Sequence, residues 1–98
     1  MAQYDVYDLT GVGLVVDVQS DLLDPLTTAV VMPFMARDAA PTPARRLNPV
    51  IEFEGQERVL VPQFMAAVQR SALQGPVGTV AEHRDDITAA LDMVFHGF

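Results

Sequence analysis

Segment 79–98 constrains the fold most strongly, because it carries the clearest helical pattern in the chain. It opens with Thr79-x-x-Glu82, a capping box whose side chains satisfy the free N–H groups at a helix start. The apolar residues that follow recur at helical spacing on one face, and they are Ile87, Ala90, Leu91, Val94 and Phe95. Gly97 stands where helices commonly end. We therefore predict one C-terminal amphipathic helix that packs on the rest of the chain.

Apolar segments with β-branched residues dominate the part of the chain that precedes this helix. They predict strands at 4–9, 14–19 and 28–37. Gly11 and Gly13 predict a hairpin turn between the first two, and Pro33 indicates an edge position or a bulge in the third. Segment 50–61 predicts a further hairpin that turns at Glu54-Gly55. The expected fold is mainly β with one α-helix, in a single domain that covers residues 1–98.

Three connections are less regular. Segment 64–73 has residues of high helix propensity but is short and precedes a Gly-Pro turn, so helix and strand both stay open. Segment 20–25 predicts a loop, in which one of Leu22 and Leu23 is expected to fill the core while the other is exposed. The proline-rich segment 38–49 either folds over the sheet or stands out as an arm.

The charge balance narrows the classes of partner. The chain has 13 acidic and 6 basic residues, a formal net charge of −7, whereas nucleic-acid binding normally needs a basic patch. The absence of cysteine excludes disulfides and cysteine-based zinc sites. Neither a secretory signal nor an apolar run of about 20 residues is visible. We expect a cytoplasmic protein that binds neither nucleic acid nor membranes directly.

No residue pattern indicates catalysis. His83 and His96 stand at opposite ends of the predicted helix, roughly 20 Å apart, so they cannot share a metal ion within one chain. A Gly-x-Ser-x-Gly nucleophile motif is lacking. We therefore predict an interaction domain without catalytic residues, cofactor or metal. The terminal Phe98 either folds back as a lid on the core or serves as an anchor in a pocket of a partner.

Several stretches together resemble the CcdB family of toxins from toxin–antitoxin modules. They are "VDVQSDLLD" (16–24), "VMP" (31–33), "NPVIEFEG" (48–55) and "DDITAALDMVFHGF" (85–98), in order and at near-constant spacing. The resemblance implies a small SH3-like β-barrel of the CcdB/MazF type with a C-terminal α-helix. It also implies strands rather than a helix within 64–73.

The resemblance further implies how such a protein acts. CcdB-like toxins form homodimers that place both C-termini side by side and bind the A subunit of DNA gyrase, a type II topoisomerase. They trap the cleaved gyrase–DNA complex without catalytic residues of their own, and they serve plasmid maintenance. A labile CcdA-like antitoxin neutralises them through a disordered tail.

The gyrase-binding residues implied by the resemblance are Leu22, Leu23, Asp92, Phe95, His96, Gly97 and Phe98. Three of these depart from the family pattern: His96 replaces a tryptophan that stacks on an arginine of gyrase, Phe98 replaces an isoleucine and Asp92 an asparagine. The first hairpin turn is also shorter and lacks basic residues that belong to the antitoxin-binding region. The cognate antitoxin should therefore differ.

Two alternatives follow from these departures and from the shared fold. In the first, the chain is a CcdB-like protein that no longer poisons gyrase and acts only as a binding partner. In the second, it is an endoribonuclease of the MazF type. The net charge of −7 and the lack of a catalytic pair argue against the second.

Overall fold

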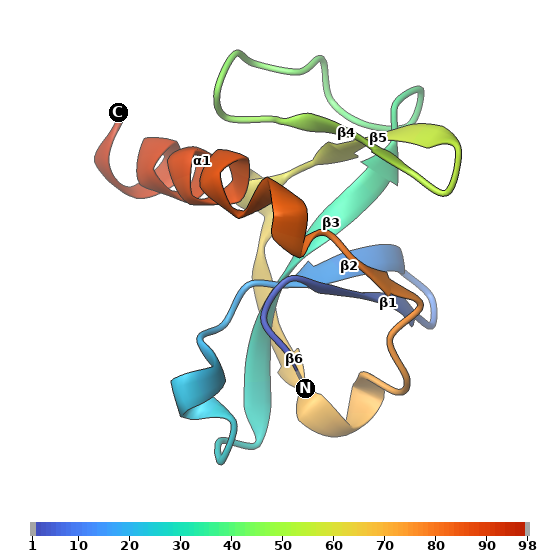
Figure 1. The fold of residues 1–98 in the computed structure, drawn as a ribbon, viewed down its shortest axis with the longest axis vertical. Coiled ribbons are helices and arrows are strands. Elements are labelled where there is room, and N and C mark those ends of the chain that lie inside the picture. Colours follow the sequence, from blue (N-terminus) through green and yellow to red (C-terminus); the bar gives the residue numbers. More distant parts are fainter. Residues whose placement is uncertain (1, 98) are drawn as a thin grey trace.

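The computed structural model describes residues 2–97, which form a mainly β fold with one C-terminal helix (Figure 1). The strands are β1 (Asp5–Leu9), β2 (Gly13–Asp17), β3 (Thr28–Ala36), β4 (Val50–Phe53), β5 (Gln56–Leu60), β6 (Ala66–Gln69) and β7 (Gly78–Thr79). The helix is α1 (Arg84–His96), and the 3-10 turns are η1 (Asp21–Leu23), η2 (Pro62–Phe64), η3 (Arg70–Ala72) and η4 (Ala81–His83). The predicted fold class is confirmed.

The strand pairs are antiparallel, and β3 pairs with three other strands, β2, β5 and β6. The main order is β4-β5-β3-β2-β1-β7, and β6 pairs with β3 off this path. The first half of β3 pairs with β2 and β6, and its second half pairs with β5. Pro33 therefore lies in a central strand, and the expected edge position is wrong. It is tolerated where β3 changes partner, because Pro33 aligns with Val15 of β2 whereas Phe34 aligns with Leu60 of β5.

The two predicted hairpins are confirmed. In the β4–β5 hairpin, Glu54 and Gly55 have φ angles of 53° and 80°, the left-handed conformations that a tight two-residue turn requires. Segment 64–73 is a strand only at Ala66–Gln69 and continues as a 3-10 turn. The pairing of β6 with β3 therefore overrides the helix propensity of this segment.

The helix begins later than the capping box predicts. The Thr79 hydroxyl accepts a hydrogen bond at 3.2 Å from the amide of Ala81, the first residue of the 3-10 turn η4, whose N-cap residue is Val80. The first residue of α1 is Arg84. Ile87 and Ala90 are buried. Ile87 belongs to the main core, which also contains Met32 and Phe34 of β3.

The proline-rich segment 38–49 is tied to the body at its C-terminal end by a buried asparagine. The Asn48 side chain accepts a hydrogen bond from the Ala44 amide at 3.0 Å. It also donates to the Leu60 carbonyl at 3.1 Å and to the Gln63 side chain at 2.9 Å. The C-terminal end of the segment is therefore fixed to the sheet, whereas most of its other residues are exposed.

Candidate functional site

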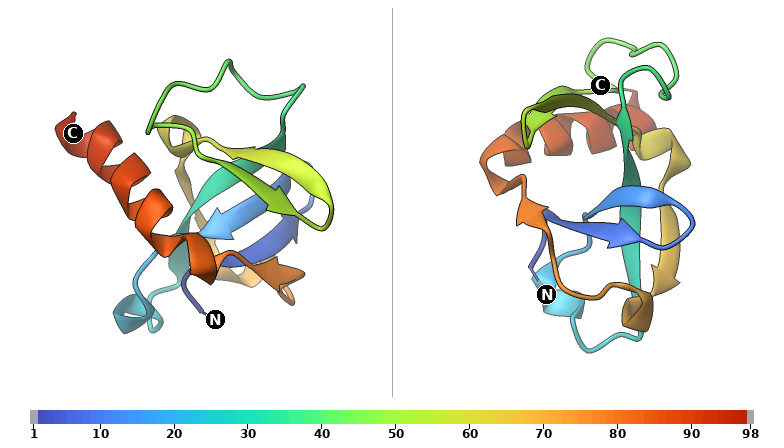
Figure 2. Two further views of the ribbon diagram at one scale, coloured as in Figure 1. Left: turned by 45° about the horizontal axis from the view of Figure 1, so that its top comes forward. Right: turned by 90° about the vertical axis from the view of Figure 1, so that its right-hand side faces the viewer.

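The C-terminal end of α1 projects past the sheet, in both Figure 1 and the left view of Figure 2. Phe95 is 65% exposed, and Asp92, His96 and Gly97 are also exposed. We call Asp92, Phe95, His96 and Gly97 the helix tip. The expected packing of Phe95 on the core is wrong, because the helix has run beyond the sheet after Leu91, which still packs on the core.

Gly97 ends the helix, as predicted. Its φ of 79° is the left-handed conformation that glycine adopts without strain, and its amide donates to the Met93 carbonyl at 3.1 Å. The tip is therefore a thin end made of one helical turn. Phe98 lies outside the described residues.

A second exposed apolar group lies on the loop after β2. Leu22 is 90% exposed, Leu23 45% and Leu26 50%. We call these three side chains the leucine knob. Neither Leu22 nor Leu23 enters the core, so the expectation that one of them fills it is wrong. The reason is the 3-10 turn η1, in which no residue is buried.

Short hydrogen bonds fix the beginning of this loop. Ser20 caps η1, since its hydroxyl accepts from the Leu22 amide at 3.2 Å. The Gln19 side chain donates to the Thr28 carbonyl at 3.0 Å and accepts from the Val30 amide at 3.1 Å. Gln19 therefore joins the start of the loop to β3, and the loop has a defined shape.

The helix tip and the leucine knob do not meet within one chain. Figure 1 places η1 at the lower left and the C-terminal end of α1 at the upper left, and both views of Figure 2 keep them apart. The predicted site residues Leu22 and Leu23 are therefore separated from Phe95 and His96. Any surface that uses both regions must be large or must include a second copy.

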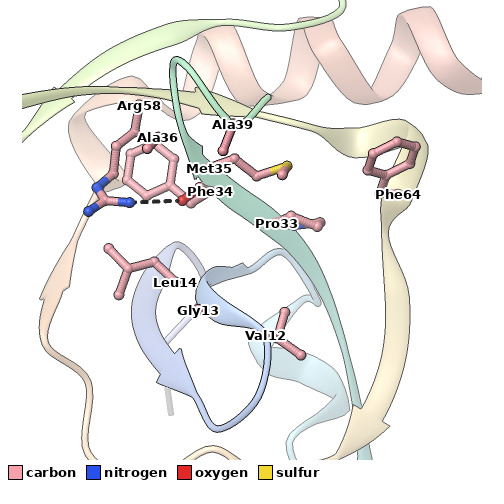
Figure 3. Close-up of a pocket in the computed structure, with 10 residues that line it drawn as sticks. All are labelled: Val12, Gly13, Leu14, Pro33, Phe34, Met35, Ala36, Ala39, Arg58 and Phe64. Atoms are coloured by element: carbon pink, nitrogen blue, oxygen red, sulfur yellow. Dashed lines mark hydrogen bonds between the residues drawn. The ribbon is translucent and has the colours of Figure 1, made fainter. Parts of the chain in front are cut away.

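An apolar groove lies beside the β1–β2 turn and is drawn in Figure 3. Its larger part is a hollow of about 280 Å³, and a smaller one of about 100 Å³ adjoins it. Both parts are lined by Val12, Pro33 and Phe64. Val12 is 62% exposed and Phe64 54%, so two large apolar side chains form its rim. Arg58 closes one end and donates to the Phe34 carbonyl at 3.3 Å.

Two buried polar groups lie on the strands that precede the knob, Tyr7 in β1 and Asp17 at the end of β2. Asp17 is 2% exposed, and burial raises the pKa of its carboxyl group, although the Gln19 amide, which donates to it at 2.9 Å, acts the other way. Burial also raises the pKa of Tyr7, as do the carboxylates of Asp5 and Asp17.

Two further features concern metal ligands and membrane-crossing helices within residues 2–97. No group of three or more histidine, aspartate or glutamate side chains there could hold a metal ion. No helix in this part of the chain is long and apolar enough to cross a bilayer.

Among the exposed apolar residues of the knob and the groove, Leu26, Val12 and Phe64 were not singled out from the sequence. Leu26 follows Pro25 and stands three residues after Leu23, and this spacing could have placed it in the same loop. Phe64 gave no comparable signal, because its exposure depends on η2 between β5 and β6.

Comparisons with known proteins agree with this geometry. The family model described as CcdB protein matches residues 3–97. A comparison with curated protein sequences gives no match. Among solved structures, an endoribonuclease in complex with its cognate antitoxin from a mycobacterial species has a TM-score of 0.78 at 10% identity, over 97% of this chain and 94% of that one. A mycobacterial endoribonuclease has a TM-score of 0.80 at 9% identity, over 97% and 90%. At these identities the likeness shows a shared fold.

Proposed function

Because the chain belongs to the CcdB family, we propose that it is the toxin of a toxin–antitoxin module and acts by binding the A subunit of DNA gyrase. The observation that carries this proposal is the exposed Phe95 at the end of a helix that has left the sheet. A large aromatic side chain on a thin projection is suited to fill a pocket of a partner protein. In this proposal the chain traps the cleaved gyrase–DNA complex by binding alone and is not an enzyme.

The charge of the molecule supports a protein partner of opposite sign. The formal net charge is −7, and Asp92 lies on the helix tip beside the apolar side chains. DNA gyrase must hold anionic DNA, so basic side chains are expected near its DNA gate. An acidic ligand would be attracted to such a surface.

We infer that the active form is a homodimer. Within the described residues β6 pairs with β3 alone, so its other edge offers unpaired backbone groups, and Ala66, Ala67 and Gln69 on it are exposed. A second copy would cover this edge. A dimer would also supply a second helix tip and a second knob, which one chain keeps apart.

We also infer that the apolar groove takes a segment of a CcdA-like antitoxin. The groove adjoins the β1–β2 turn and offers apolar walls with exposed Val12 and Phe64 at its rim. An extended or helical segment with two or three apolar side chains would cover these walls. The fold likeness to an endoribonuclease solved with its cognate antitoxin supports a partner of this kind.

The decisive experiment measures supercoiling and DNA cleavage by gyrase of the same organism. The full chain is compared with a chain lacking residues 97–98 and with Phe95→Ser, and the control is Val77→Ser, a change of an exposed apolar residue before β7. We expect linear DNA with the full chain and with the control, and none with the two tip variants.

Three other results would contradict parts of this proposal. Full activity of both tip variants would show that the tip is not the binding element. Binding to gyrase without linear DNA would identify a protein that no longer poisons gyrase. Specific cleavage of purified total RNA by the chain would identify an endoribonuclease.

The antitoxin surface is tested separately with Phe64→Glu. A charge at the rim of an apolar groove should weaken antitoxin binding, while gyrase inhibition stays unchanged because the helix tip is intact. Loss of both activities would place Phe64 on a shared surface instead.

A further inference from the structure

Arg70 joins the end of β6 to the loop that carries the leucine knob. Its Nε donates to the Leu26 carbonyl at 3.0 Å, and Nη2 donates to the carbonyls of Leu23 at 3.5 Å and Thr28 at 3.4 Å. Nη1 lies 3.6 Å from a carboxylate oxygen of Asp24. One guanidinium therefore holds backbone groups on both sides of Leu26 and one side chain of the loop.

The main chain of Arg70 strengthens this connection. Its amide donates to the carbonyl of Thr27 at 2.8 Å, so side chain and backbone bind the same short segment. The Arg70 side chain is 18% exposed, and its hydrogen bond to the Thr28 carbonyl is partly buried. By contrast, Leu22 and Leu26 are 90% and 50% exposed, so they make little packing contact that could fix the loop.

We propose that Arg70 is a positioning residue for partner binding. Its guanidinium fixes the leucine knob in the conformation that a partner protein binds. This inference rests on the proposed function, in which the knob is part of the gyrase-binding surface. Arg70 itself need not touch the partner. Its effect is to order the loop before binding, which removes a cost of immobilisation that a mobile loop would carry.

The chemistry of the guanidinium is essential to this role. Arginine presents donors in a rigid planar fork and can bind several carbonyl groups at fixed angles. Lysine has one ammonium group on a flexible stem, so it can stay close to Asp24 but cannot hold Leu23, Leu26 and Thr28 together. Replacement by lysine thus separates the role of the fork from the role of the charge.

The first measurement concerns the loop in the absence of any partner. Hydrogen exchange is compared for the full chain, Arg70→Met and Arg70→Lys, with Arg58→Met as the control because Arg58 also donates to a backbone carbonyl, that of Phe34. We expect exchange of the Leu23 and Leu26 amides to rise about tenfold in both Arg70 variants and to stay unchanged in the control. Exchange in the centre of β3 should not change.

The second measurement is the affinity for the gyrase A subunit. We expect Arg70→Met and Arg70→Lys each to weaken binding about tenfold. The loss caused by Leu22→Ala should be smaller in the Arg70→Met background than in the full chain, because a disordered knob contributes less. If Arg70 had only a structural role, the losses of affinity caused by Arg70→Met and by Leu22→Ala would be additive.

Each outcome decides the inference. Unchanged loop exchange, or full affinity of Arg70→Met, overturns it, and rescue of both readouts by Arg70→Lys would show that only the charge matters. If Arg70→Met does not fold, Arg70→Lys provides the same test, since it keeps the stem and the charge. Failure of the full chain to bind gyrase would overturn the proposed function alone, because loop exchange still reports on Arg70.

Discussion

The leucine knob and the helix tip expose apolar side chains to a similar degree, yet the fold holds them in different ways. The knob depends on Arg70, which is distant in sequence, and on Gln19 at the start of its own loop, since both side chains donate to its backbone carbonyls. The tip depends on the hydrogen bonds of its own helix, which Gly97 ends. Changes in the body of the fold should therefore alter the knob and spare the tip.

The largest expected effect follows from placing a charge in either apolar group. Phe95→Asp and Leu22→Asp should each lower the affinity for gyrase by about 2–4 kcal/mol, as for a central residue of an interface. Neither should change the melting temperature, since both side chains are exposed in the free chain. Titration of supercoiling inhibition, together with thermal melting, measures both quantities.

If only one of these variants loses affinity, the knob and the tip do not both bind gyrase. Loss with Phe95→Asp alone would restrict the binding surface to the tip. Leu26→Asp then serves as a second variant in the knob, because Leu26 is also half exposed.

The next effect separates the two regions by stability. Gln19→Leu removes the hydrogen bonds to the Thr28 carbonyl and the Val30 amide, and we expect it to lower the free energy of unfolding by about 1–3 kcal/mol. For a domain of this size, the melting temperature falls by about 4–8 °C for each kcal/mol. Gln74→Leu is the control, since Gln74 is exposed and its side chain donates to the nearby Ser71 carbonyl.

Deleting residues 97–98 should change the melting temperature far less than Gln19→Leu, because the tip lies beyond the core. A larger loss from the deletion than from Gln19→Leu would show that the tip stabilises the body. It would contradict the view that the tip is independent of the body of the fold.

The tip is held by hydrogen bonds within its own helix and the knob by a residue distant in sequence, and this explains what the sequence could predict. Local patterns sufficed for the hairpin at Glu54-Gly55, for the burial of Ile87 and for the helix end at Gly97. Helical spacing also placed Phe95 on the apolar face of the helix. It could not show that the sheet ends before this residue, because spacing along a helix contains no information about the length of the surface beneath it.

The leucine knob illustrates a second limit. Family resemblance pointed to Leu22 and Leu23, but their exposure depends on tertiary hydrogen bonds that no local pattern reveals. Arg70 is separated from Leu26 by 44 positions, and nothing near Arg70 in the sequence indicates this contact. Pro33 was misplaced for the same reason, since a change of strand partner within β3 is a property of the whole sheet.

A smaller effect tests the end of the tip. Gly97→Ala places a side chain at a φ of 79°, where there is space but the backbone conformation costs about 1 kcal/mol. The last turn can relieve this strain by losing the hydrogen bond from the Gly97 amide to the Met93 carbonyl. We expect faster exchange of the amide at position 97 and an unchanged melting temperature. A clear fall in melting temperature would show that the end of the helix is coupled to the core.

The smallest expected effect concerns Asp17, the last residue of β2. Burial raises the pKa of its carboxyl group above the ordinary value of 3.8, whereas the Gln19 amide and Arg70 lower it and so limit the shift. The folded state thus binds the proton more tightly than the unfolded state does. The stability that this provides is complete below the unfolded pKa and is lost as the pH rises through the folded pKa.

Asp17→Asn should remove this dependence, because the amide stays neutral and its oxygen can still accept from the Gln19 amide. We expect the variant to gain stability relative to the original chain as the pH rises above the ordinary value of 3.8, and the difference to stop growing once the pH exceeds the folded pKa. Urea denaturation across this range measures it, and Asp92→Asn at the exposed helix tip is the control for the loss of one charge. A difference that stays constant with pH would show that the buried carboxyl group adds nothing to the pH dependence.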